Sequence, residues 1–210
     1  MATPYGYQRF VIATDRTKHC SELSELKSWL RIDTSDEDTE IDYMGFACQK
    51  ILEDLTNTTI MQQTMTAYFD GFPPEGTPIE LPRPPLISIT HIKYVDEDGT
   101  MQTWSDSLWT VSALGKMPAT ILPIAASNYP STGDVPTTAG IAQSRYQKVQ
   151  IEYEAGYAAA ASVPDGLVVG HRMFVGHFYE NREATTTVRV HDLPLGLQMI
   201  VAANKVPEVN

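Results

Sequence analysis

One stretch constrains the fold more than any other, the segment from Val163 to Glu183. A residue before proline is biased toward extended geometry, and Pro164 suits the first turn of a helix, where its missing N–H is not needed. After it, apolar and aromatic residues recur at the three-and-four spacing of one helical face. They are Leu167, Val168, His171, Phe174, Val175, Phe178 and Tyr179. The segment predicts an amphipathic helix with one buried side, and such a pattern by itself indicates packing before function.

Two more helices are expected in the first sixty residues. The first follows Ser21, a possible N-cap, and its apolar stripe is Leu23, Leu26, Trp29 and Leu30. The second is predicted over residues 36–55, with Ser35 as its N-cap. Three acids, Asp36, Glu37 and Asp38, would place negative charge on the positive end of its dipole.

Between Thr59 and Tyr157 the sequence period changes to that of a β region. Strands are expected over residues 60–69, 87–95, 101–104, 108–113 and 146–153. Asp96-Glu97-Asp98-Gly99 has the composition of a hairpin turn. Nine of the fourteen prolines lie between Pro73 and Pro130, which disfavours helix there. Residues 128–143, rich in Ser, Thr, Gly and Pro, predict a long loop.

The two ends of the chain differ from this body. Residues 1–19 show neither period, so we expect an extended arm that a partner orders. At the other end, Leu193-Pro194 opens an apolar segment that contains Leu197, Ile200 and Val201. Such a segment predicts a short helix that packs on its own body or on a neighbouring protein, because its apolar surface would be unfavourable in water.

Composition narrows the class of protein. A chain of 210 residues suits one domain, or one domain with an insertion. The net charge of −11 divides into −5 for residues 1–60, −5 for residues 61–162 and −1 for residues 163–210, so no part is basic, which disfavours a duplex-binding or strand-binding role. Neither an apolar run long enough to span a membrane nor a secretory leader is recognised. Cys20 and Cys48 are too few for a disulfide framework, and no disulfide is expected.

No catalytic, cofactor or metal site is predicted. The Asp96 turn lacks the ligand spacing of a calcium loop, and His171 and His177 fall on different sides of a helix. Neither Gly-rich phosphate loops nor a nucleophile turn occurs in the sequence. The acids between Asp33 and Asp42 are what helix-dipole complementarity and solubility produce.

The order of several short motifs carries a resemblance to a known family. The motifs are Leu26-Lys27-Ser28-Trp29-Leu30-Arg31-Ile32-Asp33, Phe69-Asp70-Gly71-Phe72-Pro73, Leu81-Pro82-Arg83-Pro84-Pro85-Leu86, Tyr153-Glu154-Ala155-Gly156-Tyr157, Phe178-Tyr179-Glu180-Asn181-Arg182-Glu183 and Leu193-Pro194-Leu195-Gly196. Taken in sequence, they resemble the head-tail adaptor proteins of long-tailed bacteriophages, also called connector or head-completion proteins. The likeness runs from about Glu22 to Ala203 and leaves out the first twenty residues and residues 115–146.

The resemblance implies an α+β fold, in which a large β insertion interrupts a small helical bundle. The expected division is an N-terminal arm over 1–20, bundle helices over 21–57, a β insertion over 58–160, the main C-terminal helix over 161–183 and a tail with a short helix over 184–210.

The resemblance also implies a structural virion protein without a cofactor, which forms a ring of about twelve copies under the portal. The ring would complete the head and dock the tail or the next neck protein. The residues expected to bind the portal are Leu193, Pro194, Leu197, Ile200 and Val201. The protein would lie in the virion neck, and in the host cytoplasm during assembly, with no membrane partner.

Charge adds an expectation about the channel of such a ring. Acidic residues there would repel the genomic DNA, so that it passes without specific binding. Asp36, Glu37 and Asp38 are the candidates for this lining.

Three alternatives stay open on the sequence. One is a lower neck, stopper or tail-completion ring, which shares the symmetry but not the portal contact. Another is a β module that binds a ligand such as carbohydrate through exposed Trp104, Trp109 and Tyr129. The third is a hydrolase without a recognised motif.

Overall fold

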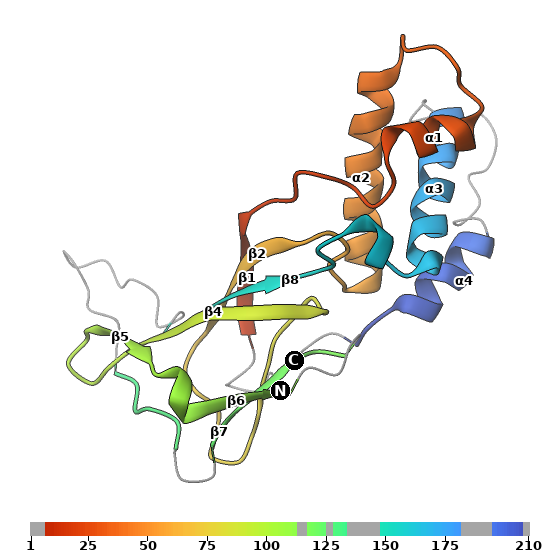
Figure 1. Ribbon diagram of the computed structural model, residues 1–210. Coiled ribbons are helices and arrows are strands. Elements are labelled where there is room, and N and C mark those ends of the chain that lie inside the picture. Colours follow the sequence, from red (N-terminus) through yellow and green to blue (C-terminus); the bar gives the residue numbers. More distant parts are fainter. Residues whose placement is uncertain (1–6, 113–116, 125–127, 134–147, 182–194, 208–210) are drawn as a thin grey trace. The chain divides into compact units, whose positions relative to one another are not determined.

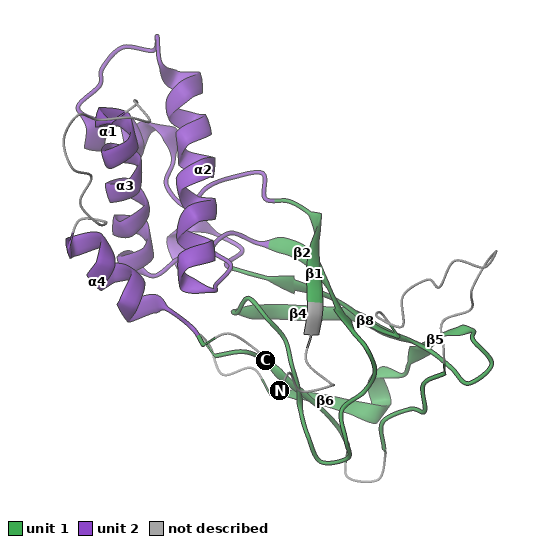
Figure 2. Ribbon diagram, turned by 180° about the vertical axis from the view of Figure 1, so that it is seen from behind, with its two compact units in different colours: residues 1–15, 63–156, 207–210 green, residues 16–62, 157–206 purple. Residues whose placement is uncertain are grey.

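The structure is a computed structural model that describes residues 7–112, 117–124, 128–133, 148–181 and 195–207 (Figure 1). Four α-helices and two antiparallel sheets make it an α+β fold, which confirms the predicted class. The chain divides into two compact units, coloured separately in Figure 2. The helical unit contains residues 16–62 and 157–206, and the β unit contains residues 1–15, 63–156 and 207–210.

The helical unit consists of α1 (Leu23–Leu30), α2 (Asp38–Thr56), α3 (Asp165–Glu180) and α4 (Leu195–Asn204), with a 3₁₀ turn at Ala160–Ser162. Helices α2 and α3 pack side by side and antiparallel, and α1 and α4 lie against them (Figure 1). The apolar faces of all four helices meet in one core. Its fully buried members include Leu26, Ile41, Leu52, Phe174, Val175 and Leu197.

The predicted helices form, but their N-terminal caps differ from expectation. Helix α1 is capped by Glu22 in a reciprocal capping box with Glu25, because Ser21 is buried and is bonded to His171. Helix α2 starts at Asp38 after Glu37, so Ser35 is not its cap. In α3 the apolar stripe holds except at Phe178, whose side chain is 41% exposed.

The β unit is built from two antiparallel sheets. The five-stranded sheet has the order β1-β2-β8-β4-β5, and the three-stranded sheet has the order β3-β7-β6. The strands are β1 (Tyr7–Thr14), β2 (Gln63–Phe69), β3 (Ile79–Glu80), β4 (Leu86–Val95), β5 (Met101–Trp104), β6 (Trp109–Ser112), β7 (Thr120–Pro123) and β8 (Val149–Ala155), and a 3₁₀ turn covers Asp106–Leu108. Strands β3 and β7 were not predicted, because two and four residues in a proline-rich stretch are too short to show a period.

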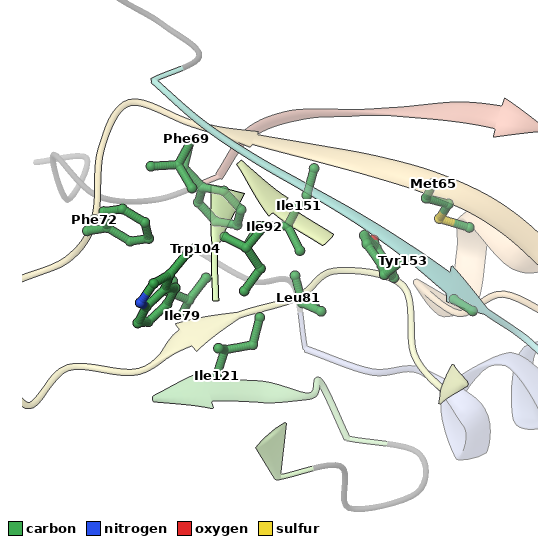
Figure 3. Close-up of a cluster of buried hydrophobic side chains, with 13 residues drawn as sticks. Met65, Phe69, Phe72, Ile79, Leu81, Ile92, Trp104, Ile121, Ile151 and Tyr153 are labelled. Atoms are coloured by element: carbon green, nitrogen blue, oxygen red, sulfur yellow. The ribbon is translucent and has the colours of Figure 1, made fainter. Parts of the chain in front are cut away.

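Side chains of both sheets meet in one apolar core (Figure 3). Strands β2 and β8 each alternate strictly, with every second side chain buried. Ile151 pairs with Ala67 on one side and Ile92 on the other, and the three-stranded sheet contributes Ile79 and Ile121. The period-two pattern of the sequence therefore sets which face of the sheet is buried.

Residues 7–14 of the predicted N-terminal arm are extended, but they form β1 at the edge of the larger sheet and are thus ordered by pairing within the chain, where a partner was expected to order them. Phe10 pairs with Ala67 and packs against the core, whereas Val11 is 44% exposed. An edge strand that is only partly covered has a weak alternation, and this is why the sequence did not reveal it. Residues 1–6 lie outside the described part.

The predicted hairpin turn between β4 and β5 forms around Asp96. Its carboxylate accepts hydrogen bonds from the backbone N–H groups of Asp98 and Thr100 and from the Gln102 amide. These donors lower the pKa of Asp96. Gly99 takes a φ of 79°, which the turn requires and which glycine adopts without strain. Of the predicted loop over 128–143, only residues 128–133 are described, and they contain neither helix nor strand.

Candidate functional site

The C-terminal segment that was predicted to bind the portal is largely built into the helical unit. Leu197 is fully buried in the core, and Val201 packs against that core. Ile200 lies so close to Gly170 that a Cβ placed there would be 2.8 Å from its Cγ2 atom. Leu193 and Pro194 lie outside the described residues. The structure thus shows these described side chains packing on their own body.

The surface that α4 leaves open is carried by two residues that the sequence reasoning did not select. Leu195 and Met199 are 68% and 63% exposed. They stand four residues apart and so lie on one face of the helix. Both residues are visibly apolar in the sequence, but most other residues of α4 are apolar too, so the pattern does not reveal which side of the helix is buried.

The three predicted channel acids have different environments. Asp36 is exposed, whereas Glu37 accepts a hydrogen bond from the Tyr179 hydroxyl. Asp38 forms an ion pair with Lys27 at 2.6 Å. Two of the three acids therefore join elements of the helical unit in addition to any effect on the surface potential.

His171 is sealed inside the helical unit and anchors the segment that enters α1. It is fully buried, with Nδ1 3.1 Å from the Ser21 Oγ and Nε2 2.8 Å from the carbonyl oxygen of Gly45. Burial lowers the pKa of His171 to about 4. The His19 ring packs at 5.4 Å from it and bonds Asp42 at 3.0 Å. A neutral, enclosed imidazole with both nitrogens engaged is a structural element, in line with the sequence interpretation.

Glu53 is a second buried anchor of the helical unit. Its carboxylate accepts hydrogen bonds from Arg16 at 3.0 Å and from the backbone N–H of Ile60 at 2.9 Å. Gln49 joins the cluster by accepting from the backbone N–H of Cys20 at 2.7 Å. The network fixes the non-helical segments before α1 and after α2, and no sequence signal predicted it.

An apolar groove opens beside α2 and the C-terminal end of α3. It has a volume of about 380 Å³ and is lined by Glu40, Met44, Ala47, Cys48, Ile51, Phe178 and Asn181. The predicted stripe of α3 would have placed Phe178 in the core, but its side chain lines this groove. Cys48 is a buried, free thiol whose pKa is raised to about 12 by burial, so it contributes apolar surface and not reactivity.

A second surface of the helical unit surrounds Trp29, which we call the Trp29 surface. A hollow of about 590 Å³ is lined there by Ser24, Glu25, Ser28, Trp29, Arg31 and Arg172. Trp29 was expected in the core stripe of α1 but is 48% exposed. Arg172 is paired with Glu25 at 3.0 Å, and Arg31 is exposed at the C-cap of α1.

The aromatic residues proposed as a carbohydrate platform belong mainly to the β core, which corrects that expectation. Trp104 is 2% exposed, and Phe72 packs edge-on against it with ring centroids 5.3 Å apart. Tyr129 stacks on Phe72, donates a hydrogen bond to the Thr77 carbonyl, and has its pKa raised to about 12 by burial. Trp109 is partly buried against the same core.

Within the described ranges, no group of three or more His, Cys, Asp or Glu side chains could hold a metal ion. No helix in that part of the chain has the length and apolarity needed to cross a membrane.

Comparison with known proteins identifies the fold. No family model and no curated protein matches the sequence. A chain in the neck of an empty gene transfer agent (GTA) particle, computed with C6 symmetry, is similar with a TM-score of 0.75 and 17% identity, over 97% of this chain and 98% of that one. A chain of the virion of the native GTA particle is similar with a TM-score of 0.74 and 17% identity, over 97% of this chain and 98% of that one. A chain in the neck of the native GTA particle, computed with C12 symmetry, is similar with a TM-score of 0.64 and 15% identity, over 95% of this chain and 97% of that one. The chain has the fold of these proteins along almost its whole length.

Proposed function

We propose that this protein is a structural subunit of the neck of a tailed, phage-like particle, where copies of it form a closed ring. The observation that carries the proposal is the likeness over 97% of the chain to a chain in the neck of a GTA particle. Those necks were computed with C6 and C12 symmetry, and a cyclic ring requires contacts between two different surfaces of each subunit. The helical unit offers two such surfaces, the apolar groove and the Trp29 surface.

In its finer form, the proposal assigns the protein to the adaptor position beneath the portal. About twelve copies would match the portal, complete the head and dock the tail or the next neck protein. Genomic DNA would pass through the ring, and the subunit would carry out no bond-making step. The resemblance of the sequence motifs to head-tail adaptors supports this position over a lower stopper ring.

The position is tested by imaging particles whose copy of this subunit carries a label. A ring of label in the neck, next to the portal, is the expected result. Capture by purified portal protein separates the adaptor from a stopper, which would not be retained. The proposal is wrong if particles without the protein still join heads to tails and keep their DNA.

For portal attachment we propose the C-terminal segment that begins at Leu193. Deletion of residues 193–210 is not a clean test of portal binding, because it would also remove the buried side chains of Leu197 and Val206 from the helical unit. Substituting the exposed residues, Leu195→Lys with Met199→Lys, leaves that core in place. We expect the double variant to lose portal capture without a change in its melting temperature, and unchanged capture would exclude this face of α4.

For the channel we propose that Asp36 contributes to an acidic lining. Asp36→Lys is the informative change, because Glu37 and Asp38 also make contacts within the helical unit. Rings of the variant should form normally while particles eject or package DNA more slowly, since a cationic lining attracts phosphate. Normal DNA passage would remove Asp36 from the lining.

A further inference from the structure

The Trp29 surface carries the exposed cation Arg31, and the apolar groove carries the exposed anion Glu40. We propose that in the ring the Trp29 indole of one copy inserts into the apolar groove of the next copy, with Arg31 facing Glu40. This inference rests on the proposed function, because it names the contact by which a ring of this chain would close.

Trp29 has the properties of an interface anchor. About half of its side chain is exposed, yet the indole rests on α3 at Gly176, where an added Cβ would lie 3.4 Å from its Nε1 atom. Glycine at this position lets the ring lie close to the helix backbone. A tryptophan held in this way loses little conformational freedom on binding, and tryptophan is enriched among residues that dominate binding energy.

The groove has the composition that such an anchor needs. Five of its seven lining residues are apolar, and Phe178 supplies an aromatic wall that is 41% exposed. An exposed aromatic beside a concave apolar surface is unfavourable in water, and burying it against an indole gains both area and an aromatic pair. Ala47, the smallest of the lining side chains, keeps the groove open.

The two surfaces lie on opposite sides of α3. Gly176 faces Trp29, and Phe178 faces the groove. Two residues of an α-helix are separated by about 200° around its axis. Each copy thus presents an anchor on one side of its helical unit and a receptor on the other, which is the heterologous arrangement that a ring requires.

Charge sets the direction of the contact. Two of the cations near Trp29 form ion pairs within their own subunit, Lys27 with Asp38 and Arg172 with Glu25. Arg31 is exposed beside them, and its backbone N–H rather than its guanidinium makes the α1 cap. Across the proposed contact, Glu40 lines the groove and is exposed. Opposite charges at the rim favour this pairing over a contact between two grooves.

Two single variants test the contact from both sides. Trp29→Ala removes the anchor, and Ala47→Arg fills the groove while retaining a good helix former. Each should weaken self-association by about 30-fold or more, the effect of losing a binding hot spot. Ala161→Arg, at another exposed alanine of the helical unit, is the matched control and should leave association unchanged. Sedimentation equilibrium measures association, and melting curves check that each variant is folded.

Mixing the two variants gives the decisive measurement. Trp29→Ala keeps its groove and Ala47→Arg keeps its anchor, so an equimolar mixture should form a one-to-one dimer with wild-type affinity, although each variant alone associates about 30-fold more weakly or worse. In a second rescue, Arg31→Glu and Glu40→Arg should each weaken the contact, and the double variant should restore it. If wild type assembles only in particles, the same variants are scored by their content in purified necks.

The outcomes separate this inference from the proposed function. If wild-type rings form and both single variants assemble normally, the inference is wrong and the proposed function stands. If wild type is found neither as an oligomer nor in a neck, the proposed function fails, and the inference with it. If Ala47→Arg lowers the melting temperature of the monomer while Trp29→Ala assembles normally, the groove is filled within one copy and the inference is overturned.

Discussion

The helical unit and the β unit bury polar groups in different ways. Nearly all the buried polar side chains belong to the helical unit, among them His171, Glu53, Gln49 and Ser21, whereas Gln63 is the one such residue of the β unit in the described ranges. The backbone N–H and C=O groups of strands find their hydrogen-bond partners in the neighbouring strands of the sheet. The helical unit must instead satisfy the irregular segments around α1 and after α2, and it does so with side chains.

The units also differ in where their aromatic residues lie. Phe69, Phe72, Trp104 and Tyr153 of the β unit are buried, whereas the exposed aromatic side chains of the described residues, Trp29, Tyr43 and Phe178, all belong to the helical unit. Aromatic side chains at a surface are typical of protein interfaces. The helical unit is therefore the better candidate for contacts with other subunits, whereas the largest buried aromatic residues of the β unit belong to its core.

The largest expected effects come from truncating one core at a time. Phe174→Ala should cost the helical unit about 3–5 kcal/mol, and Ile151→Ala should cost the β unit about 2–5 kcal/mol, because both side chains are fully buried. Hydrogen exchange by segment should show faster exchange in the unit that carries the substitution. Equal acceleration in both units would mean that their stabilities are not separate.

The polar network of the helical unit should be nearly as sensitive. Glu53→Ala removes the acceptor for Arg16, Gln49 and Ile60, and breaking a buried ion pair by removing one partner costs about 3–5 kcal/mol. Asp54→Ala is the matched control, since its pair with Lys50 is exposed. Denaturant unfolding of both variants measures the difference. Similar midpoints would show that the network adds little stability.

His171 makes the helical unit sensitive to acid. Its folded pKa of about 4 lies below the value of about 6.5 in an unfolded chain. The stability that neutral His171 contributes is therefore fully present above about pH 6.5. It is lost as the pH falls toward 4, because the unfolded chain takes up the proton first. Between pH 7.5 and 5 the unfolding free energy should fall by about 2 kcal/mol from this group.

The hydrogen bonds explain why the proton is excluded. The Gly45 carbonyl can only accept, so Nε2 donates to it, and Nδ1 is left to accept from the Ser21 hydroxyl. Protonation would replace that acceptor by a donor beside Arg172 and His19. In His171→Gln the pH dependence should be flatter by the same amount. An unchanged pH profile would assign the acid sensitivity to other groups.

Sequence reasoning predicted the parts of this molecule in which one periodicity dominates. The stripe of α3 and the alternation of β2 and β8 identified their buried faces, since most of their side chains follow one face. Trp29 and Phe178 follow the same helical stripes but are exposed, and a period cannot distinguish a residue that packs within the chain from one at its surface. The Glu53 network was missed because its members are far apart in sequence, such as Arg16 and Ile60.

The smallest effect concerns a contact between the ends of α2 and α3. The Tyr179 hydroxyl donates to Glu37, at the N-cap of α2, so Tyr179→Phe removes one charge-assisted hydrogen bond while retaining the ring. Both residues are only partly buried, and the expected loss is about 1 kcal/mol. Urea unfolding of Tyr179→Phe, Glu37→Gln and the double variant measures the coupling between them. Because the hydroxyl can bond a neutral amide as well, Glu37→Gln should cost less than Tyr179→Phe. If the two single losses simply add in the double variant, the hydrogen bond does not stabilise the helix pair, and Glu37 then acts through the dipole of α2 alone.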